Sequence, residues 1–500
     1  MNLSTSSSLR SRCAARTYLF PSVLRWGVVL VLGVVLNGCA ASHRYELVEQ
    51  TIVSGDVQRA PQIIEQAERE YGSEGRVLYD MDLGMTLHIA GQYQASNAAL
   101  EQAEDEVERL YTRRVTAETK AFLTNDTKLP YEGDLYEQTM INVVKALNYA
   151  VLGNWTEALV EARRIDHRLN VLTDRTDAKA GYRDDAFARY LSGLLYEISG
   201  DLNNALIAYR KAYEEYRRTH TWAHVTVPPM LKADLLRMTE ALHMTQEHQE
   251  YKQDFPDAVW RPYAETKALG HIVVVTHNGR APRKEDRMID VPVSMDALGL
   301  VLISKGLGNP HREGNPDRRA TESAIYGLNG HVVRIAIPAL VPQKTPGGYG
   351  QVTAIGDAGS FSAQTELMED VTALAERALS DRLAGISVKA SARAVVKYAM
   401  AEGAGRGAQA AAGKDAGPLV GLLVGSLGKA WAIASEEADK RSWRTLPDEI
   451  RIARLWVPPG DYDVRTQYAG QGAGRSGALR SQKVTIRSGE TKFFSERELP

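Results

Sequence analysis

Histidines are the side chains of this 500-residue chain whose spacing first suggests metal chemistry. His220 and His224 have the i, i+4 spacing of one helix face, and His243 and His248 lie five residues apart on the next predicted helix. A zinc site needs a third ligand on an aligned face, and the sequence contains no His-Glu-x-x-His pattern. We therefore interpret these histidines as surface or core residues of helices and predict neither a metal site nor a cofactor.

Carboxylates are the other candidates, because general acid and base catalysis uses positioned acidic side chains. Glu101, Glu104, Asp105 and Glu108 recur on one predicted helix, with a spacing that is typical of a solvated face. The sequence contains no Gly-x-Ser-x-Gly nucleophile elbow. We therefore predict that the protein is not an enzyme. A hydrolase with an unrecognised carboxylate site is the weakest alternative.

A polar and aromatic cluster follows the most apolar segment of the C-terminal half. It consists of Asp439, Arg441 and Trp443. Arg441 could satisfy a buried carboxylate, or it could mark a binding site. We favour the structural role and keep the cluster as a candidate C-terminal site.

The first 38 residues have the pattern of a secretory leader. Four arginines and no acidic residue precede the end of an apolar run, which begins near Trp26 and stops at Cys39. The run is shorter than the roughly 18 residues that a membrane-spanning helix requires. The only other cysteine, Cys13, lies inside this leader, so the rest of the chain can form no internal disulfide. The formal net charge of −2 gives no reason to expect a nucleic-acid partner.

The residues that end the leader resemble a bacterial lipoprotein signal. In such signals the motif read by the signal peptidase corresponds here to Leu36 and Gly38, and the lipid is attached to the residue that corresponds to Cys39. The resemblance implies that residues 1–38 are a signal peptide and that Cys39 anchors the chain to a membrane. Because Ala40 rather than Asp follows, it also implies an outer-membrane location facing the periplasm.

An internal repeat occupies the first half of the chain, which is too long for a single core. A turn glycine recurs with a small residue and an aromatic residue around Gly91, Gly153 and Gly200, and a weaker copy surrounds Gly55. This spacing is typical of tetratricopeptide helical hairpins, in which small residues let two helices approach. We therefore predict a TPR-like helical repeat domain over residues 39–255.

Solenoids of this kind bind partners along a concave face lined by the first helix of each hairpin. The Lys and Asn residues of a carboxylate clamp are absent from the inward positions. The groove could bind a partner helix, or the insertions or the C-terminal half could fill it, and the sequence leaves both open. The predicted groove residues are Met81, Met85, His88, Val143, Leu147, Tyr190, Leu194 and Glu197.

The composition changes after Tyr263, where strand and helix patterns alternate. We predict a mixed strand and helix domain over 264–440, with a helix from about residue 363 to 383 and a glycine-rich loop over 403–417. Short strands between Pro and Gly turns predict a small β-sandwich over 441–500. The predicted fold class is α+β and multidomain: an N-terminal TPR-like α-solenoid, a mixed α/β region and a small C-terminal β-sandwich.

Several longer motifs resemble an uncharacterised family of tetratricopeptide-containing bacterial outer-membrane lipoproteins. The resemblance covers nearly the whole chain after the leader, carries no assigned activity and implies work in the cell envelope. The motifs include Leu147-Asn148-Tyr149, Gly153-x-Trp155-x-x-Ala158, Asp439-Lys440-Arg441-Ser442-Trp443 and Leu455-Trp456-Val457-Pro458-Pro459-Gly460.

The sequence therefore predicts a lipid-anchored scaffold that faces the periplasm and recruits an envelope protein through its helical repeats. Its expected partners are envelope proteins and, through the lipid, the membrane. The alternative is a module of the C-terminal region that binds the cell wall or another envelope glycan.

Overall fold

The computed structural model describes residues 43–116, 126–175, 182, 184–294, 332–344, 348–411, 422–424, 437–469 and 479–499. The leader, with Leu36, Gly38 and Cys39, lies outside these ranges. A first helix covers 43–53. The helices that follow are α2 (Arg59–Gln66), α3 (Glu68–Tyr71), α4 (Arg76–Ile89), α5 (Tyr93–Thr116), α6 (Leu135–Val151), α7 (Trp155–Arg175), α8 (Ala186–Ile198), α9 (Leu202–Ala223), α10 (Pro229–Ala241), α11 (Thr245–Asp254), α12 (Tyr263–Ala268) and α15 (Val371–Ala411).

The strands described belong to two four-stranded sheets and one two-stranded antiparallel sheet. They are β1 (Gly270–Asn278), β2 (Arg283–Pro292), β3 (Val332–Val341), β4 (Tyr349–Gly356), β5 (Gly359–Gln364), β6 (Glu366–Asp370), β7 (Glu449–Val457), β8 (Gly460–Ala469), β9 (Arg480–Ile486) and β10 (Thr491–Glu498). The predicted mixture of helix and sheet is confirmed. None of the helices in the described ranges combines the length and the apolar character that a bilayer crossing requires.

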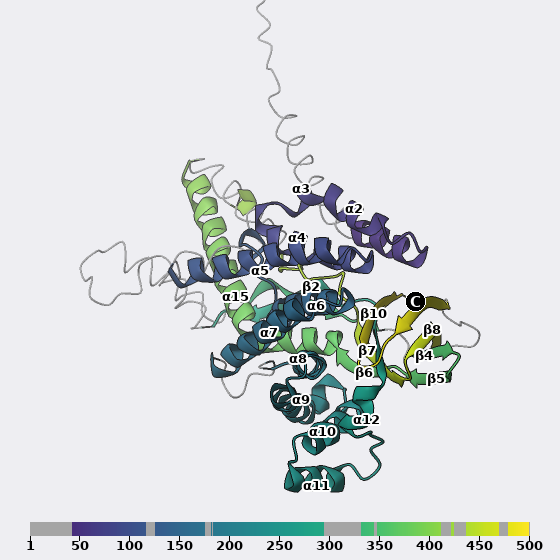
Figure 1. Ribbon diagram of the computed structural model, residues 1–500. Helices are drawn as coiled ribbons and strands as arrows, with labels where there is room; N and C mark the ends of the chain where they lie inside the picture. The colour runs from purple at the N-terminus through teal and green to yellow at the C-terminus, as the bar shows by residue number, and fades with distance from the viewer. Residues whose placement is uncertain are drawn as a thin grey trace, which may run out of the picture.

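Antiparallel helical hairpins α4/α5, α6/α7 and α8/α9 follow one another along the chain and stack side by side (Figure 1). Each turn contains a glycine in the left-handed region, with φ of +74° at Gly91, +70° at Gly153 and +81° at Gly200. The first helix of each hairpin ends with the same backbone bond, exemplified by Gln92 N donating to Leu87 O at 2.9 Å. This is the Schellman cap that a left-handed glycine permits, so the recurring glycines determine the hairpin turns.

A fourth hairpin, α10/α11, has the same turn without a glycine. His243 takes the left-handed conformation with φ of +59°, and Met244 N donates to Thr239 O at 2.9 Å. The sequence pattern missed this copy because its turn residue is histidine. His220, His224 and His243 are exposed, and His248 is buried beside Thr239.

Small residues allow the two helices of a hairpin to touch. A Cβ atom on Gly193 would lie 2.6 Å from Tyr209 Cδ1, closer than packed carbon atoms can approach. By contrast, a Cβ atom on Gly385, in the middle of α15, would have no neighbour within 4 Å. The two glycines therefore differ in packing although both are helical.

We expect Gly193→Ala to lower the free energy of unfolding by about 1–3 kcal/mol, because Tyr209 must move within a close-packed core. The matched variant Gly385→Ala should raise it by about 0.5–1 kcal/mol through helix propensity alone. Urea denaturation followed by circular dichroism measures both. Equal effects of the two substitutions would contradict the close-approach explanation.

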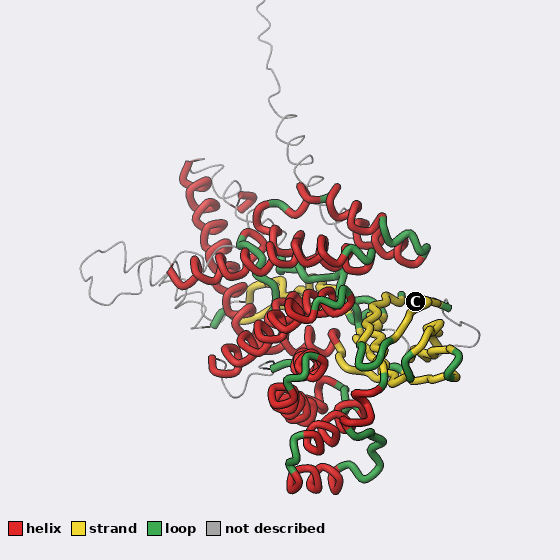
Figure 2. Tube along the Cα trace, viewed as in Figure 1, coloured by secondary structure: helices red, strands yellow, loops and turns green. Residues whose placement is uncertain are grey.

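The two larger sheets form a sandwich at one side of the helices (Figure 2). One sheet has the strand order β10-β1-β7-β6, with β1 and β10 parallel, and the other has the order β5-β4-β8-β9. Ile272, Val274, Val352 and Leu455 lie in the core between them. The opposite face of the first sheet, with Val273 and Phe493, belongs to the core of the helical repeats.

The sandwich therefore takes strands from both sides of the boundary predicted at residue 440. Strands β7, β8 and β10, from 441–500, pair with β1, β4 and β6, which lie before that boundary, and β9 pairs with β8. Sequence patterns identified the strands of 441–500 but not their partners, because sheet pairing joins segments that are distant in the chain. Residues 441–500 thus do not form a separate sandwich.

Two further predictions of local structure are wrong. Residues 366–370 form strand β6 rather than helix, and Met368 within it is fully buried. Residues 403–411 continue helix α15 instead of forming a loop, while 412–417 lie outside the described residues. Alanine is the best helix former, so the alanines that alternate with the glycines offset the low propensity of glycine.

Candidate functional site

The concave face of the helical repeats is covered by the chain's own sheet. All the predicted groove residues are buried, from Met81 and Leu194 at zero exposure to Glu197 at 6%. His88 is hydrogen-bonded to Ser495 of β10 at 2.7 Å, and Tyr190 accepts a bond from Arg454 of β7 at 2.9 Å. The prediction that this groove receives a partner is therefore wrong for this state of the molecule. The other possibility, filling by the C-terminal half, is confirmed.

A buried network of charges joins the repeats to the sheet. Arg454 Nη1 donates to Asp234 Oδ2 at 2.6 Å, and Arg237 Nε donates to Glu197 Oε1 at 2.9 Å. All four of these side chains are at most 6% exposed. Burial lowers the pKa of Arg237, but Glu197 and Asp234 outweigh it and hold that pKa above its ordinary value. Glu197 is therefore a structural counter-ion and not a groove contact.

An open cleft of about 1410 Å³ lies elsewhere, between the helical repeats and α15. Its walls come from α5, from the segment before α6, from α7, from α15 and from β3. Acidic side chains on α5 face it, including the exposed Asp105 and Glu108, and the exposed Arg163 and His167 of α7 line it as well. Apolar residues such as Leu135, which is 39% exposed, separate these charges.

The inner end of the cleft is fixed by ion pairs. Asp134, which is 5% exposed, accepts a bond from Lys284 Nζ at 2.9 Å and a second one from Arg382. Burial alone would raise the pKa of Asp134, but these two cations hold it below its ordinary value. Beneath it, burial followed by the charge of Asp134 raises the pKa of Glu137. The two carboxyls therefore have opposite shifts although they cap the same helix.

The predicted C-terminal cluster is split between the cleft and the core. Arg441 Nη2 donates to Asp439 Oδ2 at 2.7 Å, and both residues line the cleft. Arg441 Nη1 also donates to Glu74 O at 3.0 Å. Trp443 is 1% exposed and its backbone N–H donates to Glu137 Oε1 at 2.8 Å. Arg441 therefore pairs with a half-buried carboxylate at the wall of the cleft, and Trp443 is a core residue.

A second charge network supports the wall of the cleft on the repeat side. Lys145, at 1% exposure, lies within 3.1 Å of Glu161 and 2.8 Å of Glu104, and it also pairs with Glu101. Burial would raise the pKa of Glu104, but Lys145 and its neighbours lower it to about 2. Glu101 and Glu104, predicted as a solvated face, are thus ion-pair partners that hold α5, α6 and α7 together. Asp105 and Glu108 are exposed, as predicted.

No group of three His, Cys, Asp or Glu side chains within the described ranges is placed to hold a metal ion. The cleft instead offers charges of both signs with apolar surface between them. This arrangement suits the recognition of a chain that carries both charged and apolar side chains. No local sequence pattern predicts the cleft, because its walls come from segments that are far apart in the chain.

Comparison with known proteins leaves the family of this chain open. No protein-family model matches it, and no curated protein sequence is significantly similar. Among solved structures, it is similar to the Rap conjugation gene regulator of the plasmid pLS20 in complex with the Phr* peptide, with 15% identity and a TM-score of 0.25. The match covers 42% of this chain and 52% of the regulator, so the chain spans about half the length of that protein. A likeness this loose carries no conclusion about function.

A pair of buried carboxyls links the repeats to β6 next to the cleft. Asp185 and Glu369 are hydrogen-bonded to each other and are 1% and 4% exposed. Burial, followed by the neighbouring Asp185, raises the pKa of Glu369 well above its ordinary value of 4.5. Ionising both carboxyls would place two negative charges in contact, which is electrostatically unfavourable. The pair therefore retains a proton.

We expect this pair to make the protein less stable at alkaline pH. A raised pKa in the folded state contributes stability that is complete below the unfolded value and is lost as pH rises through the folded value. Urea midpoints measured between about pH 5 and pH 9 should therefore fall, and Glu369→Gln should make that fall shallower. The exposed Glu285→Gln serves as the control. An unchanged slope in Glu369→Gln would show that the pair does not retain its proton.

Proposed function

We propose that the protein is a lipid-anchored scaffold that faces the periplasm and binds an envelope protein, with the cleft between the repeats and α15 as its contact site. The observation that carries this proposal is the contrast between two surfaces. The concave groove is filled by the protein's own sheet, whereas none of the described residues fills the cleft of about 1410 Å³. A scaffold needs an accessible surface, so the cleft replaces the groove as the candidate.

The character of the cleft supports a polypeptide partner. Exposed acids on α5 and exposed bases on α7 line the same cleft, with the partly exposed side chains of Tyr111 and Leu135 among them. Charges of opposite sign fix the orientation of a bound chain, and aromatic and apolar side chains contribute most of the binding free energy. The buried carboxyls of the inner end are engaged by cations and backbone donors, which supports binding rather than catalysis.

The anchor rests on the leader and on Cys39, which lie outside the described residues. A lipid at the N-terminus would keep the cleft close to one membrane and raise the local concentration of its partners there. Cys39→Ser should therefore release the protein from the membrane fraction without changing its fold. If Cys39→Ser remained in the membrane fraction, the proposed lipid anchor at Cys39 would be wrong.

In-cell photo-crosslinking tests the contact site. We would place a photoreactive phenylalanine analogue at Tyr111, which is 43% exposed in the cleft, and at Tyr349, which is 42% exposed on β4 outside it. Because Tyr111 and Tyr349 are equally exposed, random collisions should give equal crosslinking yields at the two positions. Capture of the same envelope protein at Tyr111 but not at Tyr349 supports the proposal. Equal or absent capture, with retention of the protein on isolated cell wall, would favour the glycan-binding alternative instead.

A further inference from the structure

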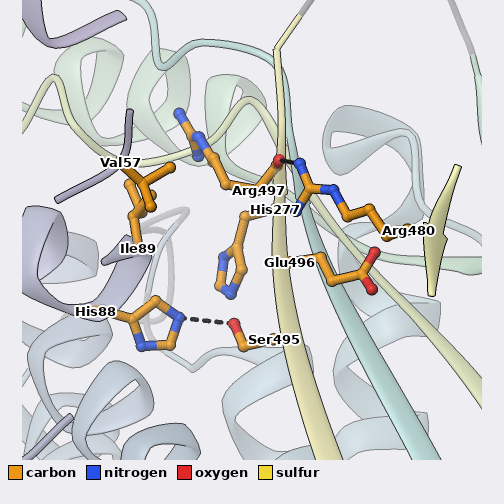
Figure 3. Close-up of a pocket in the computed structure, with 8 residues that line it drawn as sticks. All are labelled: Val57, His88, Ile89, His277, Arg480, Ser495, Glu496 and Arg497. Atoms are coloured by element: carbon orange, nitrogen blue, oxygen red, sulfur yellow. Dashed lines mark hydrogen bonds between the residues drawn. The ribbon is translucent and has the colours of Figure 1, made fainter. Parts of the chain in front are cut away.

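A small cavity of about 50 Å³ lies where the helical repeats meet the edge of the first sheet. Its lining comes from the end of α4 with His88 and Ile89, from β1 with His277, from β10 with Ser495 and Arg497, and from Val57 (Figure 3). His277 and Arg497 are directly paired in the parallel register of β1 and β10. Paired residues of neighbouring strands share a sheet face, so both belong to the side of the sheet that meets the repeats.

The hydrogen bonds of His88 are complete. Its Nδ1 lies 2.6 Å from Asn148 Oδ1, and its Nε2 lies 2.7 Å from Ser495 Oγ. The Asn148 amide nitrogen donates to Ser96 and Asn97, so its oxygen accepts and His88 Nδ1 carries the proton. Ser495 then donates to His88 Nε2. Burial lowers the pKa of His88 to about 4, which is consistent with this neutral ring.

His277 and Arg497 differ from His88, because each carries buried nitrogen atoms without a hydrogen-bond partner among the described residues. Both ring nitrogens of His277, which is 1% exposed, lack a partner among the residues that the structure describes. The same holds for Nε and Nη1 of Arg497, whose Nη2 donates to Leu446 O at 3.1 Å. Buried polar groups in proteins are almost always hydrogen-bonded, so these N–H groups require an explanation.

The other charged residues of the lining already have hydrogen-bond or ion-pair partners. Glu496 Oε2 accepts a bond from Tyr468 at 2.9 Å, and its Oε1 accepts one from Thr466 at 3.2 Å. Arg480 donates to the backbone oxygen of Arg497 and lies 3.6 Å from Glu498.

Burial, with a smaller effect of Arg280, lowers the pKa of Arg497 to about 9, although Glu49 partly offsets this. A guanidinium at that value is still charged at neutral pH.

We propose that this cavity binds a small monovalent anion, of the size of a halide, which accepts hydrogen bonds from Arg497 and His277. The unpartnered groups are an arginine and a neutral imidazole, which can donate to a common acceptor, and a negative charge compensates the buried guanidinium. One water needs about 10–15 Å³ of such space, so the cavity of about 50 Å³ has room for one halide and a few waters. The guanidinium would repel a cation at the same place.

The anion would lie where α4 meets β1 and β10, held by two donors that both belong to the sheet. Binding to the folded state alone raises stability in proportion to the logarithm of ligand concentration. This inference concerns a different place from the cleft and does not depend on the proposed function.

The test compares sodium chloride with sodium gluconate at equal ionic strength, using the full chain after the leader. Gluconate is too large for the cavity, so it controls for charge screening. We expect the midpoint of thermal unfolding to be about 2 °C higher in chloride. We also expect crystals grown in sodium bromide to show an anomalous peak inside the cavity, beside Arg497 and His277. Equal midpoints in the two salts together with an empty or water-filled cavity would overturn the proposal.

Two variants tie the effect to the named donors. Arg497→Met and His277→Phe should each abolish the difference between chloride and gluconate, whereas Arg465→Met, at an exposed position of β8, should retain it. If Arg497→Met does not fold, His277→Phe and the bromide peak still decide the question. A chloride effect that survives both substitutions would place the anion elsewhere and reject this site.

Discussion

Replacing Arg454 with methionine should lower the free energy of unfolding by about 3–5 kcal/mol, because it removes one cation from a buried network that holds two carboxylates. Arg454 is 6% exposed at its side chain and bonds Asp234 at 2.6 Å. After the substitution, Arg237 alone would have to compensate both Asp234 and Glu197. Methionine has similar length and no charge, so packing is retained while the counter-charge is lost.

The same network also closes the concave groove. Arg454 lies on β7, whereas Asp234 is on α10 and Tyr190 is on α8, so the variant weakens the contact between sheet and repeats. Circular dichroism during urea denaturation gives the stability. The control is Arg465→Met, whose partner Asp463 is also on β8 and whose side chain is 45% exposed. It should lose no more than about 1 kcal/mol. Similar losses in the two variants would show that burial of Arg454 is unimportant.

Trp443→Ala should cost about 3–5 kcal/mol, because it opens a large cavity in the core of the helical repeats. The side chain is 1% exposed and belongs to the same core as Phe493 and Val273. Its indole N–H has no hydrogen-bond partner among the described residues, so Trp443→Phe should lose much less. Crosslinking at Tyr111 should be unchanged in Trp443→Phe. Loss of capture there without loss of stability would give Trp443 a role in binding instead.

The helical repeats could be predicted because their signals are local. Gly91, Gly153 and Gly200 terminate helices through bonds that reach only five residues back along the chain. Small residues such as Gly193 meet a side chain of the next helix in the same hairpin. Within each hairpin these residues keep the same offsets from the turn glycine, and such offsets are directly visible in a sequence.

The exposure of the groove could not be predicted, because a buried apolar residue and a groove residue look identical in a sequence. Met81, Met85 and Leu147 occupy the concave positions that were predicted, and a sheet built partly from the last strand of the chain covers that face. Strand β10 pairs with β1, which lies more than two hundred residues earlier. No local pattern records that pairing.

Glu104 and Asp134 show that a local sequence pattern also fails to predict whether a charged side chain is buried. A cluster of acids on a helix predicts solvent exposure unless cations from other segments come close. Lys145 approaches Glu104 from another helix, and Lys284 approaches Asp134 from β2. A carboxylate on a solvated face thus becomes a buried ion pair through a partner that the local sequence does not reveal.

The sequence by itself determined the leader pattern with Cys39, the helical hairpins and the presence of strands in the last sixty residues. Those features follow from composition and short-range periodicity. Only the tertiary structure decided that the concave groove is filled, that the sandwich spans the predicted boundary at 440, and that an open cleft lies beside α15. The physical reason is that burial and surface shape depend on which distant segments pack together, and those contacts form only when the chain folds.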